Sequence, residues 1–287
     1  PIPHPRAHGQ SRVLANRSII PSMAPCAMRD LTPQFPVPVY LINLDRSPDR
    51  LAHAAAELDR CGIPFTRVPA IDGKQLGDLP WPDFDDACYR RRHGKHPVPG
   101  EWGCYMSHVL AIKTFLASSD APAALILEDD IVLPADFPAL IEGILRHAPD
   151  WDMVKLVANR RGLIAGAIPI SGSYRMGVSL RATACSGAYL LNRRAATRYV
   201  EKLLPMTLPY DHEFDQGWLY GLRVRVVDPL PVSQSATSFP STIANTRKFP
   251  WYKRGNVLLY RACKELRRMA HGVREACTTP ATSRPPA

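Results

Sequence analysis

The sequence contains no apolar run long enough to cross a bilayer. No stretch of its 287 residues approaches the roughly 20 consecutive apolar residues of a membrane-spanning helix. The first thirty residues carry scattered arginine and proline and lack the continuous apolar core of a secretory signal peptide. We therefore expect a cytoplasmic protein that does not span a membrane.

Paired cysteine motifs are also missing. The seven cysteines form an odd number without any C-x-x-C pair, which argues against a disulfide framework or a zinc site and favours a reducing compartment. Acidic residues are fewer than basic ones, 26 against 36, and the net charge of +10 favours anionic partners. No nucleic-acid-binding motif occurs and the aromatic residues do not interleave regularly with the basic ones, so we expect no nucleic-acid partner.

Apolar patterning predicts one α/β domain with an open, mostly parallel sheet. Residues 37–44 are apolar on both alternating faces, as in a strand buried on both sides, and a helix with Pro48 at its first position follows at once. With a strand at 65–68 this makes a β-α-β unit. Further helices are expected at 102–118, after Asp136 and at 193–204, and further strands at 123–127, 153–157, 184–191 and 222–227.

The ends and two internal stretches lack such patterning. Proline-containing tails are expected to be disordered at 1–35 and 276–287, on either side of a domain at 36–240 and a basic amphipathic segment at 241–275. Residues 73–100 and 158–181 are expected to be long loops at the active site, because loops of such length in a compact domain are usually functional.

Three consecutive carboxylates, Glu128, Asp129 and Asp130, follow the apolar strand 123–127. Like charges are costly where water is partly excluded, and a divalent cation with oxygen ligands, Mn²⁺ or Mg²⁺, would remove that cost. Strand alternation predicts Glu128 and Asp130 on one side and Asp129 on the other. A solvated acidic turn is the alternative, and metal phosphohydrolases use similar clusters, so the triplet indicates a metal more clearly than a reaction.

Several short blocks occur in an order that resembles a known family. They cover roughly residues 37 to 230, and a series of ordered blocks is more specific than any one of them. The chain resembles glycosyltransferase family 25, the lipopolysaccharide and lipooligosaccharide galactosyltransferases, whose relatives include collagen galactosyltransferases. The matching blocks are 39–46 with Arg50, 68–73, 100–108, 127–130, 186–193 and 209–211.

The resemblance implies a GT-A type fold and transfer of a hexose, galactose, from a UDP-sugar to a lipopolysaccharide or related glycan with inversion. It also implies that Glu128, Asp129 and Asp130 fill the metal-binding role of the usual D-x-D motif, with Asp130 favoured as the ligand. Arg46 and Arg50 would then bind the diphosphate through charge-assisted hydrogen bonds, although a solvated helix start would look the same.

Other candidate site residues carry less information individually. By the same resemblance Asn43 and Asp72 would contact the nucleoside, and His108 would line the site rather than act as a catalyst. Lys155 is a further donor-binding candidate, because it lies within an apolar strand and a buried lysine needs an anionic partner. A sheet edge with a solvated ammonium is the alternative.

An inverting transfer requires a base that takes the proton of the acceptor hydroxyl. Asp211 matches a family block, and at helical spacing Asp215 would share its face, so both are candidate catalytic residues. A helix cap and a contact to metal or sugar are the other interpretations of Asp211. Competing functions are a metal phosphohydrolase that uses the triplet and a non-catalytic binding protein with a glycosyltransferase-like fold.

The segment between Arg247 and Arg274 has nine basic residues against one acid, Glu265. Apolar residues recur through it at helical spacing and give an apolar stripe beside a cationic face, at Leu258, Ala262, Leu266, Met269 and Val273. Either the stripe packs on the domain with a solvated basic side, or residues 247–275 form a peripheral anchor on an anionic membrane. A lipid-linked acceptor would place the second alternative at the cytoplasmic face of the inner membrane.

Overall fold

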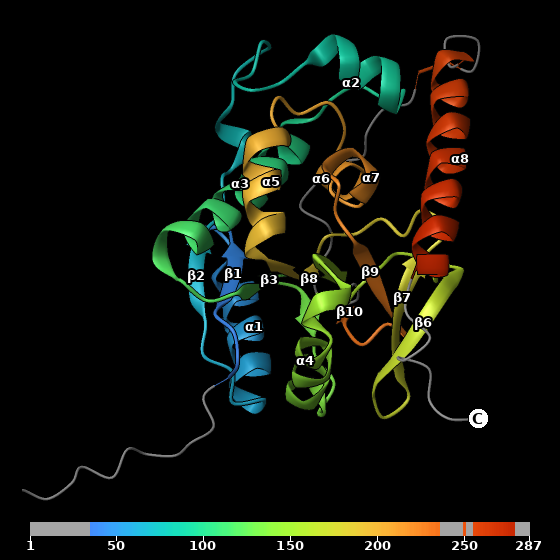
Figure 1. Ribbon diagram of the computed structural model, residues 1–287. Coiled ribbons are helices and arrows are strands. Elements are labelled where there is room, and N and C mark those ends of the chain that lie inside the picture. The colour runs from blue at the N-terminus through green and yellow to red at the C-terminus, as the bar shows by residue number, and fades with distance from the viewer. Residues whose placement is uncertain (1–34, 236–248, 251–254, 279–287) are drawn as a thin grey trace, which may run out of the picture. The chain divides into compact units, whose positions relative to one another are not determined.

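The computed structural model describes residues 35–235, 249–250 and 255–278 (Figure 1). Residues 1–34 and 279–287, which hold most of the two predicted tails, lie outside the described residues, as do residues 241–248 and 251–254 of the predicted basic segment. No helix of the described part combines the length and the apolar character that crossing a membrane requires.

An eight-stranded sheet forms the centre of the fold. Two of its strands, at Ala188–Asn192 and Tyr174–Ser179, run opposite to the other six, so the sheet is mixed but mostly parallel, as predicted. In spatial order the strands are β2 (Thr66–Pro69), β1 (Val39–Asn43), β3 (Ala123–Glu128), β8 (Ala188–Asn192), β5 (Met153–Lys155), β9 (Val224–Asp228), β7 (Tyr174–Ser179) and β6 (Ile164–Ser171).

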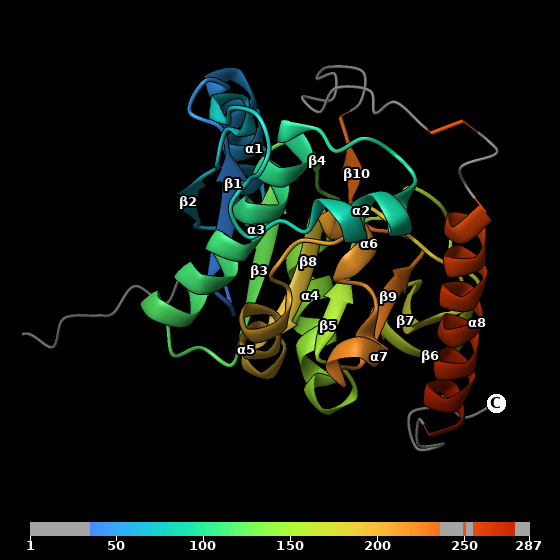
Figure 2. The same cartoon turned by 90° about the horizontal axis from the view of Figure 1, so that it is seen from above.

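Helices cover both faces of the sheet, which confirms the predicted α/β class (Figures 1 and 2). Alternate residues of β1 enter two separate cores: Leu41 packs with the helices of one face and Tyr40 with those of the other. The first face carries α1 (Pro48–Arg60) and α4 (Phe137–Arg146), and the second carries α3 (Pro99–Ser118), α5 (Arg193–Lys202), α6 (Tyr210–Glu213) and α7 (Gly217–Tyr220).

The opening β-α-β unit follows the predicted order β1, α1, β2. β1 pairs with β2 on one side and with β3 on the other, in parallel in both cases. The carboxyl ends of these three strands therefore lie at the same edge of the sheet, where open α/β sheets bind their ligands. Short elements extend the fold nearby: a 3-10 turn η1 (Gly73–Gln75) precedes α2 (Asp86–His93), and β4 (Ile131–Val132) pairs with β10 (Ser233–Gln234).

The prediction of a functional loop at 158–181 is wrong. Residues 164–179 form the antiparallel hairpin β6–β7, which extends the sheet beyond β9. Register shifts interrupt the pairing between Ala165 and Ile168, next to Gly166, whose φ is +57°. A β-bulge of this kind breaks the simple alternation by which a strand is recognised in a sequence.

The C-terminal segment forms one long helix, α8 (Gly255–Thr278), which begins within the predicted basic segment and continues three residues past it. It packs on α2, β6 and β7 at the edge of the sheet (Figure 1). Gly272 permits close packing, because a Cβ there would lie 2.5 Å from the side chain of Leu180. The hairpin therefore provides the surface that α8 covers.

Candidate functional site

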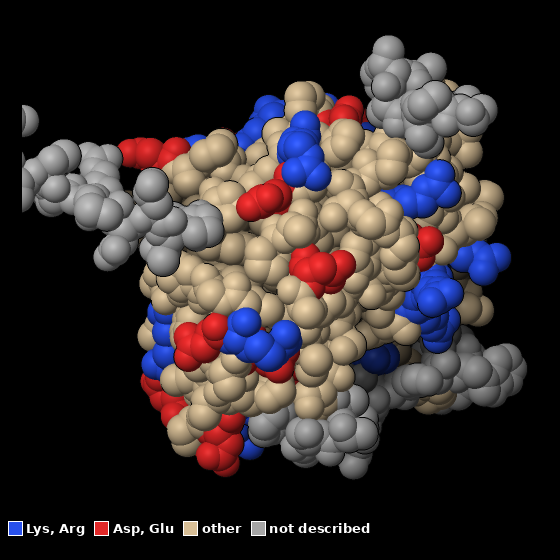
Figure 3. All heavy atoms as spheres, turned by 90° about the horizontal axis from the view of Figure 1, so that it is seen from below, with Lys and Arg blue, Asp and Glu red and all other residues tan. Residues whose placement is uncertain are grey.

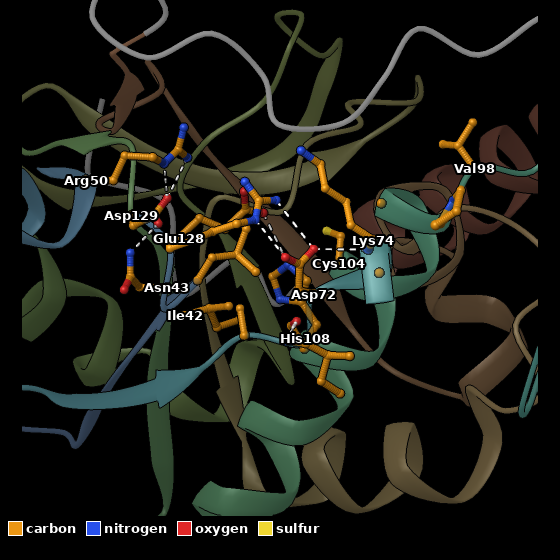
Figure 4. Close-up of a pocket in the computed structure, with 18 residues that line it drawn as sticks. Ile42, Asn43, Arg50, Asp72, Lys74, Val98, Cys104, His108, Glu128 and Asp129 are labelled. Atoms are coloured by element: carbon orange, nitrogen blue, oxygen red, sulfur yellow. Dashed lines mark hydrogen bonds and ion pairs between the residues drawn. The ribbon is translucent and has the colours of Figure 1, made fainter. Parts of the chain in front are cut away.

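A cavity of about 330 Å³ lies at the carboxyl ends of β1, β2 and β3 (Figure 4). The end of β1 and the turn into α1 supply Asn43, Arg46 and Arg50, and the segment after β2 supplies Asp72. The end of β3 supplies Glu128 and Asp129, and α3 crosses beneath with His108. Seven of the residues singled out in the sequence thus line one cavity: Asn43, Arg46, Arg50, Asp72, His108, Glu128 and Asp129.

Arg50 neutralises two of the three consecutive carboxylates. Its Nη2 lies 2.5 Å from Oδ1 of Asp129 and 3.1 Å from Oδ2 of Asp130. Burial by itself would lower the pKa of Arg50, but the hydrogen bonds and charges of Asp129 and Asp130 outweigh it and raise that pKa. A guanidinium therefore relieves much of the repulsion for which the sequence suggested a metal ion.

The remaining oxygens of these two aspartates are also engaged. Asn43 donates from Nδ2 to Oδ2 of Asp129 at 2.7 Å, and Gln234 donates from Nε2 to Oδ1 of Asp130 at 3.2 Å. Asp130 does not line the cavity. Burial, followed by the charge of Glu128, raises the pKa of Asp130, so these two carboxylates repel each other.

Glu128 is the carboxylate of the triplet that keeps an oxygen for a ligand. Ser186 donates from Oγ to its Oε1 at 2.8 Å, and Nε2 of His108 lies 3.2 Å from the same oxygen. Burial would raise the pKa of Glu128, but the hydrogen bonds and charge from His108, with Ser186, lower it overall. Ionised Glu128 therefore presents a negative charge at the cavity.

A buried aromatic chain fixes His108. Its Nδ1 lies 3.1 Å from the hydroxyl of Tyr189, which lies 3.0 Å from the hydroxyl of Tyr210. The ring of Tyr210 stacks on His108 with centroids 4.2 Å apart. Cys104 lies one helical turn before His108, and its Sγ, a ring nitrogen of His108 and an oxygen of Glu128 lie within 4.8 Å of one another.

Lys155 and Asp211 hold a strained turn beside the cavity. Ala184 and Cys185 both have positive φ, at 34° and 70°, a region that costs energy for residues other than glycine. Lys155 donates from Nζ to the carbonyl of Ala184 at 2.9 Å, and the backbone N–H of Cys185 donates to Oδ2 of Asp211 at 3.2 Å. The turn leads directly into Ser186, so these two contacts position the hydroxyl that binds Glu128.

Asp215 lies away from the cavity and is bound by α8. It is buried, and Nη1 and Nη2 of Arg268 donate to its two oxygens at 3.3 and 3.2 Å. Burial would raise the pKa of Asp215, but the charges of Arg268 and Lys155 lower it. The helix α6 ends at Glu213, so Asp211 and Asp215 do not share a helical face. Asp211 stands in the first turn of α6, whose N-cap is Pro209.

Sequence reasoning did not single out several residues of the site. Lys74 lines the cavity beside Asp72, whose carboxylate binds Arg46 at 2.7 Å (Figure 4). The hydrogen bond from Arg46, against a small burial effect, lowers the pKa of Asp72. A buried threonine, serine or cysteine gives no periodic signal of its own, so Ser186 and Cys104 could be found only inside the matching blocks. Lys155 does not line the cavity.

In comparisons with known proteins, the part of the chain that builds this cavity matches a family model. Residues 37–162 match the model of "Glycosyltransferase family 25 (LPS biosynthesis protein)". A "Glycosyltransferase 25 family member" of Aedes aegypti is 31% identical over 123 residues, which cover 40% of this chain and 20% of that protein. "Procollagen galactosyltransferase 1-A" of Xenopus laevis is 29% identical over 187 residues, 60% of this chain and 30% of that protein. The chain thus spans less than a third of the length of either relative.

Solved structures show looser likenesses. S. aureus TarS, residues 1–349, aligns at 12% identity with a TM-score of 0.42, over 85% of this chain and 70% of that one. An active-site mutant of LgtC aligns at 15% identity with a TM-score of 0.35, over 66% and 72% of the two chains. The sequence relationship is the firmer one, and it confirms the resemblance that the ordered blocks predict: residues 37–162 match glycosyltransferase family 25.

Proposed function

We propose that this chain is a metal-dependent glycosyltransferase that transfers a hexose, galactose, from a UDP-sugar to a lipopolysaccharide or related glycan with inversion. The observation that carries the proposal is the cavity at the ends of β1, β2 and β3, because all of its lining residues lie within residues 37–162, the part of the chain that matches family 25. Its volume of about 330 Å³ falls at the lower end of the usual 300–1,000 Å³ for small-molecule sites.

The charges of the cavity suit a sugar nucleotide. Lys74 and Arg46 line one side, where an ammonium and a guanidinium would bind diphosphate oxygens. Asn43 and Asp72 remain our candidates for contacts to the nucleoside. Arg50, which already binds Asp129 and Asp130, would contribute by holding the triplet in place and by adding positive charge next to the diphosphate.

A divalent cation fits this site best at Glu128. Asp129 and Asp130 have their oxygens engaged by Arg50, Asn43 and Gln234, whereas both hydrogen bonds that Glu128 receives fall on Oε1. His108 and Cys104 lie nearest to this carboxylate. A carboxylate oxygen suits both Mn²⁺ and Mg²⁺, so the cation would be one of these two. When bound, the cation would stabilise the negative charge that grows on the leaving diphosphate.

Asp211 remains the proposed base. Its Oδ2 accepts from Cys185, which leaves Oδ1 for an acceptor hydroxyl that approaches over the turn 184–186. Asp215 and Lys155 would position neighbouring segments and not touch the substrate. Asp215 binds Arg268 of α8, and Lys155 donates to the carbonyl of Ala184 in the turn 184–186. We further propose that the acceptor is lipid-linked and that the protein works peripherally at the cytoplasmic face of the inner membrane.

The melting temperature separates this proposal from its two rivals. Because the nucleotide and the cation would bind next to each other, UDP with Mn²⁺ should raise the melting temperature more than the sum of the rises with each alone. A rise with Mn²⁺ only would favour a metal phosphohydrolase that uses Glu128. No response to any of the three conditions would favour a non-catalytic binding protein.

A further inference from the structure

The outward side of α8 is apolar. Eight large hydrophobic side chains are exposed in the described part of the chain, and five of them belong to this helix. They are 50–66% exposed, at Leu258, Leu259, Leu266, Met269 and Val273. Soluble proteins seldom leave such residues together on one surface unless the surface contacts something.

These residues form one continuous stripe. Leu259, Leu266 and Val273 recur every seven positions, and Ala262 and Met269 fall between them at helical spacing. Cys263 and Ala270 are exposed on the same side and widen the stripe. Figures 1 and 2 both show α8 at the edge of the molecule, with β6 and β7 on its inner side. We call this outward surface the α8 stripe.

The inner side of α8 carries the charges. Lys264 and Arg268 are buried, and Arg268 binds Asp215. Burial would raise the pKa of an unpaired Asp215 and disfavour its charge, so the domain needs a cation at this place. The basic side of α8 thus faces the domain and the apolar stripe faces outward. This is the opposite of the interpretation in which the apolar stripe packs on the domain.

The charges that remain beside the α8 stripe are positive. Arg267 and Arg274 are exposed and form no ion pair within the described residues. The two acids of the helix are engaged: Glu265 lies 3.5 Å from Arg268, and Glu275 lies 3.0 Å from Arg225. In Figure 3 basic side chains also predominate on the side of the lower face where Figure 1 places α8.

We propose that the α8 stripe lies in the headgroup region of an anionic membrane, with Arg267 and Arg274 against the lipid phosphates. The inference rests on the proposed peripheral location and adds the surface that makes the contact. Helices with a broad apolar face and flanking cations bind membrane interfaces in this way. Lys264 and Arg268 do not take part, because both are buried against the domain and Arg268 binds Asp215.

A second copy of the chain fits the stripe less well. The seven-residue recurrence is that of a coiled coil, but the positions beside such a seam normally carry pairs of opposite charge. Here those positions are Leu258, Cys263, Glu265, Ala270 and Gly272, and the one charge among them, Glu265, already lies 3.5 Å from Arg268 of its own helix. Two copies would therefore lack the pairs of opposite charge that normally flank such a seam.

Vesicle co-sedimentation with the full chain tests the inference. The vesicles contain phosphatidylcholine alone or with phosphatidylglycerol, at low and high salt. One variant removes apolar contacts, Leu259→Gln with Leu266→Gln and Met269→Gln, and its control is Leu79→Gln with Leu163→Gln, at exposed leucines off the helix. A second variant removes charge, Arg267→Gln with Arg274→Gln, and its control is Arg160→Gln with Arg161→Gln, an exposed pair off the helix.

The expected result is salt-sensitive binding to the anionic vesicles only. The apolar variant should lose it, and the charge variant should bind roughly 25-fold more weakly, about five-fold for each arginine. Both controls should bind like the wild type, and all variants should keep its melting temperature because the changed residues are exposed.

Three outcomes would overturn the inference. The first is equal binding by the wild type and the apolar variant, and the second is no binding to any vesicle. The third is a wild-type dimer in sedimentation velocity that the apolar variant converts to a monomer while vesicle binding is unchanged, which would assign the stripe to a second copy. No sugar donor enters the assay, so its failure is distinct from a failure of the proposed transfer.

Discussion

Arg50 and Glu128 have different roles at the acidic triplet: Arg50 pairs with Asp129 and Asp130, and Glu128 is the proposed ligand of the cation. Since Arg50 compensates Asp129 and Asp130, we expect the cation to depend mainly on Glu128. Glu128→Gln should weaken Mn²⁺ binding by more than about 100-fold, because loss of even an outer partner of a ligand costs 10–100-fold. Titration of the electron paramagnetic resonance signal of free Mn²⁺ measures this. An equal loss in Asp130→Asn, with Glu128→Gln unaffected, would move the cation to the third carboxylate.

Asp211 offers a kinetic test of the proposed base. Asp211→Asn should reduce turnover by roughly 10²–10⁴-fold, because the acceptor proton then has no positioned acceptor. The KM for the UDP-sugar should stay close to the wild-type value. A parallel loss of donor binding would instead place Asp211 at the donor. A large fall in melting temperature with normal turnover would mean that Asp211 has only a structural role, through its hydrogen bond from Cys185.

The sequence predicts individual site residues where ordered blocks fix their position in the sheet. Asn43, Arg50 and Glu128 follow neighbouring parallel strands, so their meeting at one edge could be expected. The partner of Asp215 could not be predicted from the sequence. Asp215 binds the guanidinium of Arg268, which lies more than fifty residues later on a helix whose position no local pattern predicts.

The contact between α2 and α8 should be sensitive to acid. His93, at the end of α2, is buried, and Arg261 of α8 donates to its carbonyl at 3.0 Å. Burial, with nearby cations, lowers the pKa of His93 to about 3. Between pH 6.5, the usual pKa of a histidine, and about pH 3, the unfolded chain binds a proton at His93 that the folded chain does not. The free energy of unfolding therefore decreases as the pH is lowered below about 6.5.

We therefore expect the melting temperature to fall between pH 7.5 and pH 5, and to fall less in His93→Phe, which keeps the ring contact to Tyr89. Differential scanning calorimetry at the two values measures the difference. An identical fall in the variant would mean that other groups carry the pH dependence.

Arg268 should hold α8 to the domain. Removal of one partner of a buried ion pair typically costs about 3–5 kcal/mol, so Arg268→Met should destabilise the protein strongly. Arg267→Met, one residue earlier and exposed, is the matched control and should stay within about 0.5 kcal/mol. Adding Asp215→Asn to Arg268→Met should recover part of the loss in urea unfolding. No recovery would place the cost in lost packing against Trp218 instead.

At the scale of elements, hydrophobic periodicity predicts that a helix or strand exists better than it predicts which side of that element faces the domain. It finds β1, α1 and β3, whose patterns are uninterrupted, but the bulge at Gly166 hides β6. It also identifies α8 as amphipathic without telling which side faces the domain. The usual assumption that the apolar side packs fails here, because the receiving surface contains a buried carboxylate.

At the scale of the molecule, the sheet brings together the segments that match family 25. Residues 37–162 supply β1, β2, β3 and α3, and thereby the walls of the cavity, while later strands extend the sheet toward α8. The cavity and the α8 stripe thus belong to different parts of the chain. We expect substitutions in the stripe to leave transfer to a soluble acceptor unchanged.

A transfer assay with the purified chain tests the central claim most directly. Each of a panel of UDP-sugars is incubated with Mn²⁺ and a glycan acceptor, and both UDP release and glycosylated product are measured. We predict UDP release coupled to product with UDP-galactose, and loss of both in Glu128→Gln. Phosphate release without glycosylated product, or no reaction with any UDP-sugar under conditions where the protein is folded, would contradict the assignment.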